Sequence, residues 1–134
     1  MPQLNVIVVT PEQTVLEQPA EFVALPLFDG EIGIATGHSP MIGRLGYGEM
    51  RIRQTGHTQT LYLDGGFVQV ANNVVSVLTN RALTADRLDP SVAADQLSAA
   101  RTRKANTDEL RAIRDRLESQ ARAQLRVASK VTRR

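Results

Sequence analysis

The 134-residue sequence has no cysteine, which excludes disulfide scaffolds, thiol catalysis, iron–sulfur clusters and cysteine-ligated zinc. It has no apolar run that approaches about 18 residues, the length expected of a membrane-spanning helix. Histidine is scarce as well. Only His38 and His57 are present, with no carboxylate at ligand spacing, so we expect no metal site.

Familiar catalytic motifs are incomplete in this sequence. The segment Gly37–Met41 half-resembles a nucleophile elbow, but Met41 stands where the second glycine belongs. No Gly-Lys-Ser/Thr follows a glycine run, so a phosphate-binding P-loop is absent. Gly46-Tyr47-Gly48 lacks the third glycine of a dinucleotide-binding fingerprint. We therefore expect no enzymatic activity of the chain alone and no cofactor.

Composition divides the chain into two unlike parts. Residues 1–84 contain four basic and seven acidic side chains, a net charge of −3, whereas residues 85–134 contain twelve basic and seven acidic ones, a net charge of +5. All nine glycines lie between Gly30 and Gly66, and ten alanines follow residue 84. Glycine punctuates sheets and alanine favours helices, so we predict a β domain at 1–84 and a helical domain at 85–134.

The first part contains segments rich in β-branched residues and separated by turn signals. Pro26 interrupts the apolar segment 22–28, and its missing backbone donor predicts either an edge strand or a bend. Asp64-Gly65-Gly66 is expected to be a turn between strands at 58–63 and 67–70, with Phe67 and Val70 in the core. The other predicted strands are 4–9, 31–34, 50–53 and 74–78. About eight to ten short strands in this pattern predict an antiparallel β-sandwich.

The second part has the signals of two helices. Asp89 is a favourable N-cap with Pro90 at the first helical position, and this helix is expected to run to about Lys104. Asn106 followed by Glu109 fits a capping box for the second helix. Together they predict an antiparallel two-helix hairpin, so the chain is expected to be of the α+β class. The apolar residues expected between the helices are Ala93, Leu97, Ala100, Leu110, Ile113, Leu117, Ala121 and Leu125.

The basic character of the second part leaves its partner open. Its arginines are interleaved with acidic residues, as on a solvated helix face, and they could also bind an acidic protein surface. No aromatic residue follows Phe67, so the tail has no platform on which nucleic acid bases could stack. The residues by themselves are also compatible with a stand-alone β-sandwich binding module whose basic helical tail docks on an acidic protein or on nucleic acid.

Three blocks of the first part resemble signature segments of the ATP synthase epsilon subunit family, of the bacterial and plastid type. They are Leu4–Thr10 followed by Pro11-Glu12, the loop Gly30–Pro40 (GEIGIATGHSP) and the segment Leu63–Leu78 (LDGGFVQVANNVVSVL). The resemblance implies a β-sandwich followed by a helical hairpin. It also implies a non-catalytic rotor subunit of the central stalk, which couples ion movement through the c-ring to ATP synthesis and hydrolysis in the catalytic head.

The resemblance further implies partners and contact residues. The sandwich would lie between the gamma subunit and the c-ring, with Glu31 and His38 as candidates for the contact with the c-ring. The hairpin would conditionally reach the alpha and beta subunits and inhibit ATP hydrolysis, and no nucleic acid partner is implied. The candidates for the inhibitory contact are Arg111, Arg114, Arg122 and Arg126.

We expect the chain to reach a membrane only through such a complex. The beginning of the sequence carries no basic and apolar secretory signal and no Arg/Ser-rich import signal. The expected location is the cytoplasmic face of a bacterial plasma membrane, with the stromal face of a plastid thylakoid as the alternative.

A nucleotide-binding motif of the family is degraded here. Some members bind ATP through an Ile/Leu-Asp-x-x-Arg-Ala motif at the start of the first helix. Leu88, Asp89 and Ala93 match this motif, but Val92 stands where its arginine belongs. Without that guanidinium the site lacks a planar donor for phosphate oxygens.

We predict from this substitution that the chain binds ATP weakly or not at all, since Val92 offers no hydrogen-bond donor to a phosphate. Titration calorimetry of ATP into the purified chain measures the affinity directly. A dissociation constant in the low micromolar range would contradict the prediction.

Overall fold

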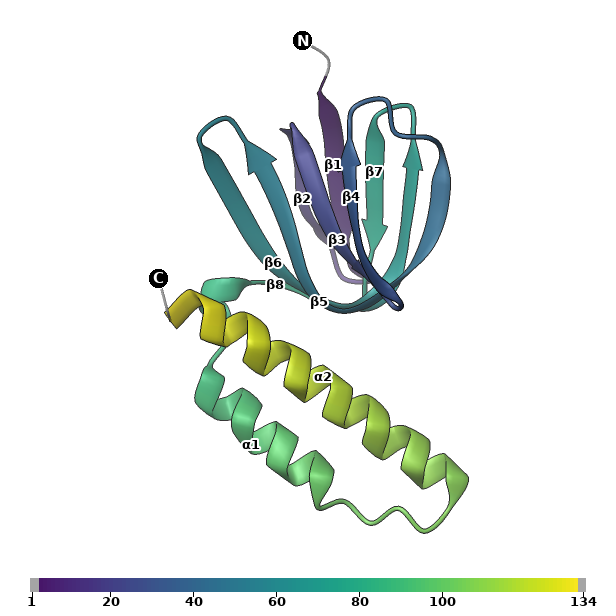
Figure 1. Cartoon of the computed structure of the whole chain (residues 1–134), viewed down its shortest axis with the longest axis vertical. Coiled ribbons are helices and arrows are strands. Elements are labelled where there is room, and N and C mark those ends of the chain that lie inside the picture. Colours follow the sequence, from purple (N-terminus) through teal and green to yellow (C-terminus); the bar gives the residue numbers. More distant parts are fainter. Residues whose placement is uncertain (1–2, 133–134) are drawn as a thin grey trace. The chain divides into compact units, whose positions relative to one another are not determined.

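A computed structural model describes residues 3–132 of the chain, which divides after Leu83 into two compact units. The first unit is built of strands and the second of helices (Figure 1), so the expected α+β class is confirmed. The strands are β1 (Leu4–Val9), β2 (Thr14–Ala20), β3 (Phe22–Leu27), β4 (Gly30–Ala35), β5 (Met41–Gln54), β6 (His57–Ala71), β7 (Val74–Leu78) and β8 (Ala82–Thr84). The 3-10 turn η1 (Ala85–Arg87) precedes the helices α1 (Pro90–Arg101) and α2 (Asp108–Thr132).

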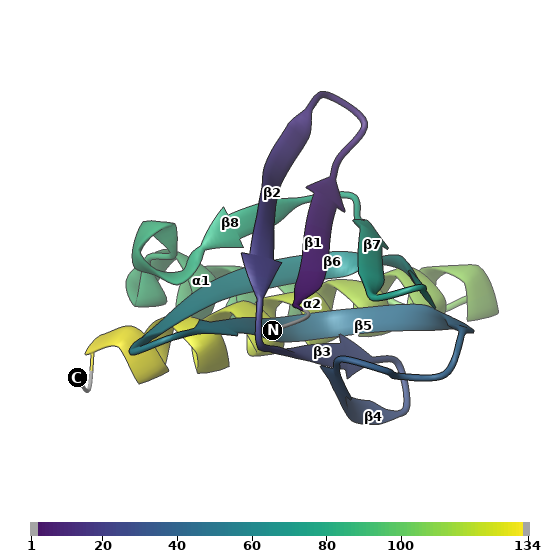
Figure 2. The same ribbon diagram turned by 90° about the horizontal axis from the view of Figure 1, so that it is seen from above.

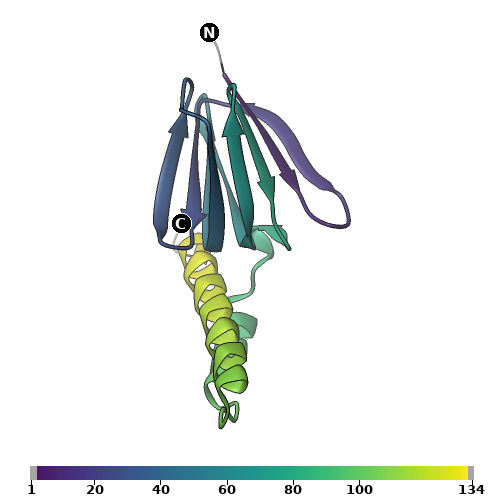
Figure 3. The same ribbon diagram turned by 90° about the vertical axis from the view of Figure 1, so that its right-hand side faces the viewer.

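The strands form one mixed sheet that folds over to enclose its own core. Their order is β2-β1-β7-β6-β5-β3-β4, with β8 paired to β6. Two layers are visible from the side in Figure 3, and Figure 2 shows β1 and β2 running across the direction of the long strands β5 and β6. The pair β1–β7 is parallel, so the prediction of an entirely antiparallel sandwich is wrong at this pair.

The hairpin β5–β6 is much longer than predicted and contributes to both layers. β5 has 14 residues and β6 has 15, and the expected turn at 64–66 lies inside β6. Buried residues change parity at this point, from Leu61 and Leu63 to Val68 and Val70. Gly65 and Gly66 have φ values of 75° and 110°, which glycine adopts readily and other residues rarely do. At these two residues the strand bends without ending.

Pro26 lies in a strand that is not at the edge of the sheet. β3 pairs with β4 on one side and with β5 on the other. The register between β3 and β5 shifts between Ala24 and Leu27, around Pro26. Of the two alternatives predicted for Pro26, an edge strand or a bend, the structure therefore confirms the bend.

The core of the first unit lies between the two layers of the folded sheet. Buried and less buried side chains alternate along β1, which contributes every second residue to this core: Leu4, Val6 and Val8 are buried, and the residues between them are not. Each such side chain contributes about 1.5–3 kcal/mol when it is fully buried. The core residues with at most 3% exposure are Leu4, Val6, Val8, Ala20, Val23, Leu25, Ile34, Leu45, Met50, Ile52, Leu61, Leu63, Val68, Val70, Val75 and Val77.

The start of α1 follows the prediction, whereas the start of α2 does not. The carboxylate of Asp89 accepts a hydrogen bond from the backbone N–H of Ser91 at 2.9 Å, which confirms the N-cap. α2 is capped by Thr107, whose Oγ1 accepts from the N–H of Leu110 at 3.1 Å. The predicted capping box at Asn106 is wrong by one residue, because Thr107 and not Asn106 supplies the side-chain oxygen that accepts from an amide of the first turn. α1 also ends before the predicted Lys104, at Arg101.

The apolar seam of the helical unit is narrow, as predicted, but its strongest burial is in the second half of α2. Ala93, Leu97 and Ala100 of α1 are buried, and so is Ala121 of α2. The other predicted residues of α2 are half-buried, namely Leu110, Ile113, Leu117 and Leu125. Buried residues that the prediction omits are Ala123, Gln124, Val127 and Ala128.

We predict that Gly66→Ala destabilises the sandwich strongly, because a Cβ at residue 66 would lie 1.9 Å from the carbonyl oxygen of Leu78 at a φ of +110°. The free energy of unfolding should fall by about 3 kcal/mol or more. Gly56→Ala is the matched control, since Gly56 has a φ of +70° but no atom within 4 Å of its Cβ position, so a loss of about 1 kcal/mol is expected. Urea unfolding followed by circular dichroism measures both, and equal losses would contradict the argument.

Candidate interaction surfaces

The described part of the chain assembles no cluster of metal-ligating side chains. Within residues 3–132, no group of three or more His, Cys, Asp or Glu side chains is arranged to hold a metal ion. No helix among the described residues combines the length and apolarity needed to cross a membrane. The candidate residues of the two units lie largely on exposed surfaces, and each unit is described by itself.

The first unit exposes large apolar side chains on one face of its sheet. Phe28, Ile42, Phe67 and Leu78 have exposed fractions of 66%, 76%, 58% and 54%. We call these four residues the apolar face. Contiguous exposed apolar residues on a soluble chain usually mark a contact with another protein.

The register of the sheet brings the apolar face together from distant parts of the sequence. Arg44 lies directly opposite Phe67, which lies opposite Leu78 on the next strand. Leu78 is in turn paired with the half-buried Val9 of β1. On the other side, the backbone N–H of Phe28 donates to the carbonyl oxygen of Arg44 at 3.0 Å. The row therefore crosses the sheet without interruption.

The sequence prediction missed the apolar face and misplaced one of its members. Phe67 was expected in the core with Val70, and it is exposed while Val70 is buried. Phe67 and Val70 are three positions apart, and side chains at this spacing on one strand point to opposite sides of the sheet. The spacing therefore excludes that both side chains lie in the core. That spacing is the signal in the sequence that could have identified the face.

Glu31, the first candidate for the contact with the c-ring, is held in an ion pair. One oxygen of Glu31 lies 2.5 Å from Nη2 of Arg51, and Glu49 lies 3.0 Å from Nη1 of the same guanidinium. The hydrogen bonds that Arg51 donates to Glu31 and, as the smaller cause, to Glu49 raise the pKa of Arg51 above its ordinary value. The side chain of Glu31 is still 54% exposed, so its orientation is constrained while it faces solvent.

His38, the second candidate, lies at the other end of β4. Its backbone N–H donates to the carbonyl oxygen of Ala35 at 3.2 Å, and its Nδ1 lies 2.7 Å from the carbonyl oxygen of Ser39. The four residue steps from Glu31 to Ala35 span about 13 Å along a strand. The structure therefore does not bring Glu31 and His38 together in one small site.

The loop that carries His38 is tied to another turn of the first unit. The N–H of Gly37 donates to Oδ1 of Asn73 at 2.8 Å. Asn73 belongs to the turn between β6 and β7, where Asn72 and Asn73 both have a positive φ. Two of the three segments that resemble the family's signatures are thus joined by a hydrogen bond.

The four candidate arginines lie on one side of α2. With 3.6 residues per turn, their positions fall within an arc of about 120°. Three of them are paired with carboxylates of the same helix, and Arg126 is exposed without an ion pair to any described residue. The pairs are Arg111–Asp108 at 2.6 Å, Arg114–Asp115 at 3.4 Å and Arg122–Glu118 at 2.5 Å.

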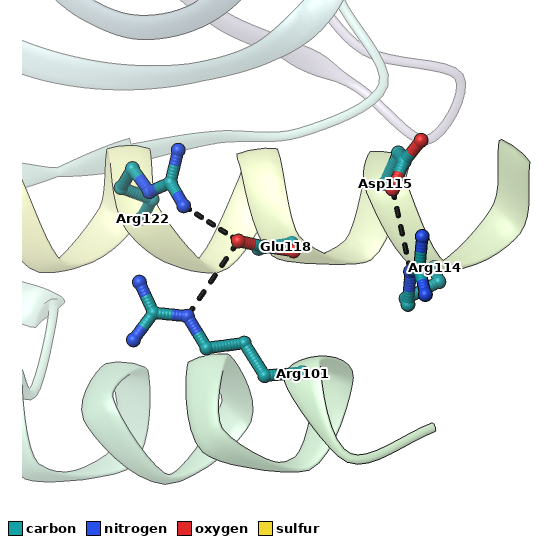
Figure 4. A network of polar contacts seen from close by, with 5 residues as sticks. All are labelled: Arg101, Arg114, Asp115, Glu118 and Arg122. Atoms are coloured by element: carbon teal, nitrogen blue, oxygen red, sulfur yellow. Dashed lines mark hydrogen bonds and ion pairs between the residues drawn. The ribbon is translucent and has the colours of Figure 1, made fainter. Parts of the chain in front are cut away.

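Glu118 also joins the two helices of the second unit. Its Oε1 accepts from Arg122 and lies 3.5 Å from Nε of Arg101 on α1 (Figure 4). The pair Glu118–Arg122 has the i, i+4 spacing that stabilises helices. Partly exposed pairs of this kind contribute about 0–1 kcal/mol each, so they can exchange partners at little cost.

The degraded nucleotide motif has a structural role in the described chain. The carboxylate of Asp89 is engaged as the N-cap of α1. Val92 is 50% exposed, so the position of the missing arginine is filled by an apolar side chain that faces solvent.

Comparison with known proteins identifies the family. The ATP synthase delta/epsilon chain β-sandwich domain family matches residues 3–85. The chain is 46% identical over 125 residues to the ATP synthase epsilon chain of Rhodopirellula baltica, which covers 93% of this chain and 98% of that protein. The chain belongs to the ATP synthase epsilon-chain family. An epsilon chain of Synechococcus sp. is 37% identical over 127 residues, 93% of each protein.

Solved structures share the fold of this epsilon-family chain at much lower identity. A chain in the mitochondrial ATP synthase of Euglena gracilis, solved with its F1 part and c-ring, has a TM-score of 0.84 at 19% identity and covers 100% of this chain and 84% of its own. A chain in the central stalk and c-ring of the Tetrahymena thermophila mitochondrial ATP synthase has a TM-score of 0.76 at 16% identity. The match covers 95% of this chain and 97% of that chain. The family resemblance inferred from the three sequence blocks is confirmed.

Proposed function

We propose that this chain is a non-catalytic subunit of the central stalk of a rotary ATP synthase. It couples ion movement through the c-ring to ATP synthesis and hydrolysis in the catalytic head. Its family membership supports this role. The two relatives above are both ATP synthase epsilon chains, and each matches this chain over nearly its whole length. The observation that carries the proposal is the apolar face of the sandwich.

We assign the apolar face as the surface of the sandwich that contacts the gamma subunit. Its four side chains are more than half exposed, and covering each one fully would contribute about 1.5–3 kcal/mol to association. Exposed aromatic residues at the centre of such a patch are typical of residues that dominate a protein interface. A rigid sheet also holds them in place before binding, which lowers the entropy lost on assembly.

Glu31 is the residue proposed to contact the polar loops of the c-ring. Its carboxylate is exposed and is oriented by Arg51, which suits a contact with polar groups rather than an apolar one. His38 remains a second candidate. Because it lies beyond the opposite end of β4, about 13 Å along the strand, a partner that touches both residues has to extend along the whole strand.

The helical hairpin is proposed to inhibit ATP hydrolysis through contact of its basic side chains with acidic segments of the beta subunits. The four candidate arginines present a row of cations along one side of α2, and three of them have weak local partners that a stronger acidic surface could replace. The complex is proposed to lie on the cytoplasmic face of a bacterial plasma membrane, which this chain reaches only through its partners.

We predict that the tagged chain co-purifies with the alpha, beta, gamma and c subunits from mildly solubilised native membranes, as identified by mass spectrometry. The double variant Ile42→Ser, Phe67→Ser should lower their recovery at least about tenfold, because two central apolar contacts are lost. Val92→Ser is the matched control, since Val92 is 50% exposed but belongs to the helical unit. Recovery of the unaltered chain alone, with nucleic acid or with an unrelated acidic protein would favour a stand-alone binding module instead.

We predict that alanine at all four candidate arginines raises ATP hydrolysis by the assembled enzyme toward the rate found when the hairpin is deleted. The reason is that the proposed inhibitory contact depends on their positive charge. Arg116→Ala is the control, because this exposed arginine lies on α2 outside the arc of the other four. Unchanged hydrolysis in the quadruple variant, in an enzyme that the deletion does activate, would rule the contact out. The residues replaced are Arg111, Arg114, Arg122 and Arg126.

A further inference from the structure

We propose that Arg44 determines the specificity of the apolar face by binding a carboxylate of the partner that covers it. The occupant we assign is an apolar segment of a stalk subunit that carries an aspartate or glutamate opposite Arg44. This inference rests on the proposed function, since it requires a partner on the face. It adds a chemical requirement that apolar contact by itself does not impose.

Arg44 lies at the centre of the apolar face. Phe67 is directly opposite it on β6, and Ile42 is two residues away on the same side of β5. The guanidinium carbon of Arg44 lies 5.7 Å from the centre of the Phe28 ring. Neighbouring strands are about 5 Å apart, so apolar side chains flank this cation at close range on three sides.

The positive charge of Arg44 lacks an ionic partner within the described chain. Arg44 is exposed and forms no ion pair with any residue of 3–132. Arg51, seven positions further along β5, shows the contrast, since it binds the carboxylates of both Glu31 and Glu49. The ring of Phe28 stabilises a guanidinium but does not neutralise its charge.

An uncharged partner would therefore be penalised on this face. Covering the four apolar residues removes water from around Arg44, and burying an unpaired charge is strongly unfavourable. A carboxylate opposite Arg44 removes this penalty. The planar guanidinium can bind both oxygens of a carboxylate at once while one of its faces lies over the Phe28 ring. Charge complementarity thus selects an acidic residue within an otherwise apolar partner segment.

The test measures binding of the purified full-length chain to the F1 sector of its own ATP synthase from which this subunit has been removed. The decisive variant is Arg44→Leu, which keeps the face apolar and removes the charge. We expect Arg44→Leu to weaken binding about 100-fold, because it leaves the partner carboxylate buried and unpaired. Arg44→Glu should weaken it further, and Arg44→Lys should retain part of the affinity.

Arg53→Glu is the matched control. Arg53 is on the same strand, is exposed, and lies over an aromatic ring in the same way, with its guanidinium carbon 5.0 Å from the centre of Phe22. It is not part of the apolar face, so we expect a change in affinity of less than about twofold. The thermal unfolding of each variant is measured in parallel, and no loss of stability is expected because both side chains are exposed.

The outcomes separate this inference from the proposed function. If the unaltered chain does not bind the depleted F1 sector, the proposed function fails. If it binds and Arg44→Leu binds equally well or better, the face is recognised by apolar contact alone and only the role of Arg44 is overturned. If the chain forms a dimer in sedimentation that Arg44→Glu dissociates, a second copy covers the face and the assigned partner is wrong.

Discussion

The close approach of Gly66 to the backbone of Leu78 is the constraint on which the rest of the sandwich depends. No Cβ fits at residue 66, and two successive positive φ values let β6 bend without ending. Because β5 remains paired with β6 on both sides of this bend, one hairpin supplies strands to both layers. The bend also reverses which residues face the core, and this reversal turns Phe67 outward.

The two units differ in how their surfaces are stabilised. The sheet keeps an apolar face uncovered, and among its aromatic and aliphatic side chains lies Arg44, which forms no ion pair with any residue that the structure describes. The hairpin instead carries several of its arginines in local ion pairs, and Glu118 links the two helices through Arg101. A fixed apolar surface suits permanent assembly, whereas exposed ion pairs that contribute little individually suit a contact that forms and dissociates. This contrast is consistent with a structural role for the sheet and a regulatory role for the helices.

Local rules predicted the parts of the fold in which a residue acts on its own neighbours. Asp89 followed by Pro90 predicted the start of α1, because an N-cap needs only the amides of the next turn. The same rule misplaced the start of α2, since Asn106 and Thr107 are both good caps and the sequence does not say which one is used. The Asp-Gly-Gly signal at 64–66 failed for another reason. Glycines at positive φ occur both in turns and in bends of a continuing strand.

The sequence by itself determined the two-part α+β architecture, the family and the lack of the motif arginine at Val92. These follow from composition, from local periodicity and from contiguous signature segments. Only the tertiary structure decided that Phe28, Arg44, Phe67 and Leu78 are neighbours, and that Glu31 and His38 are not. Cross-strand neighbours depend on register and on the position of the bend. Both are set by long-range packing of the sheet rather than by any single segment.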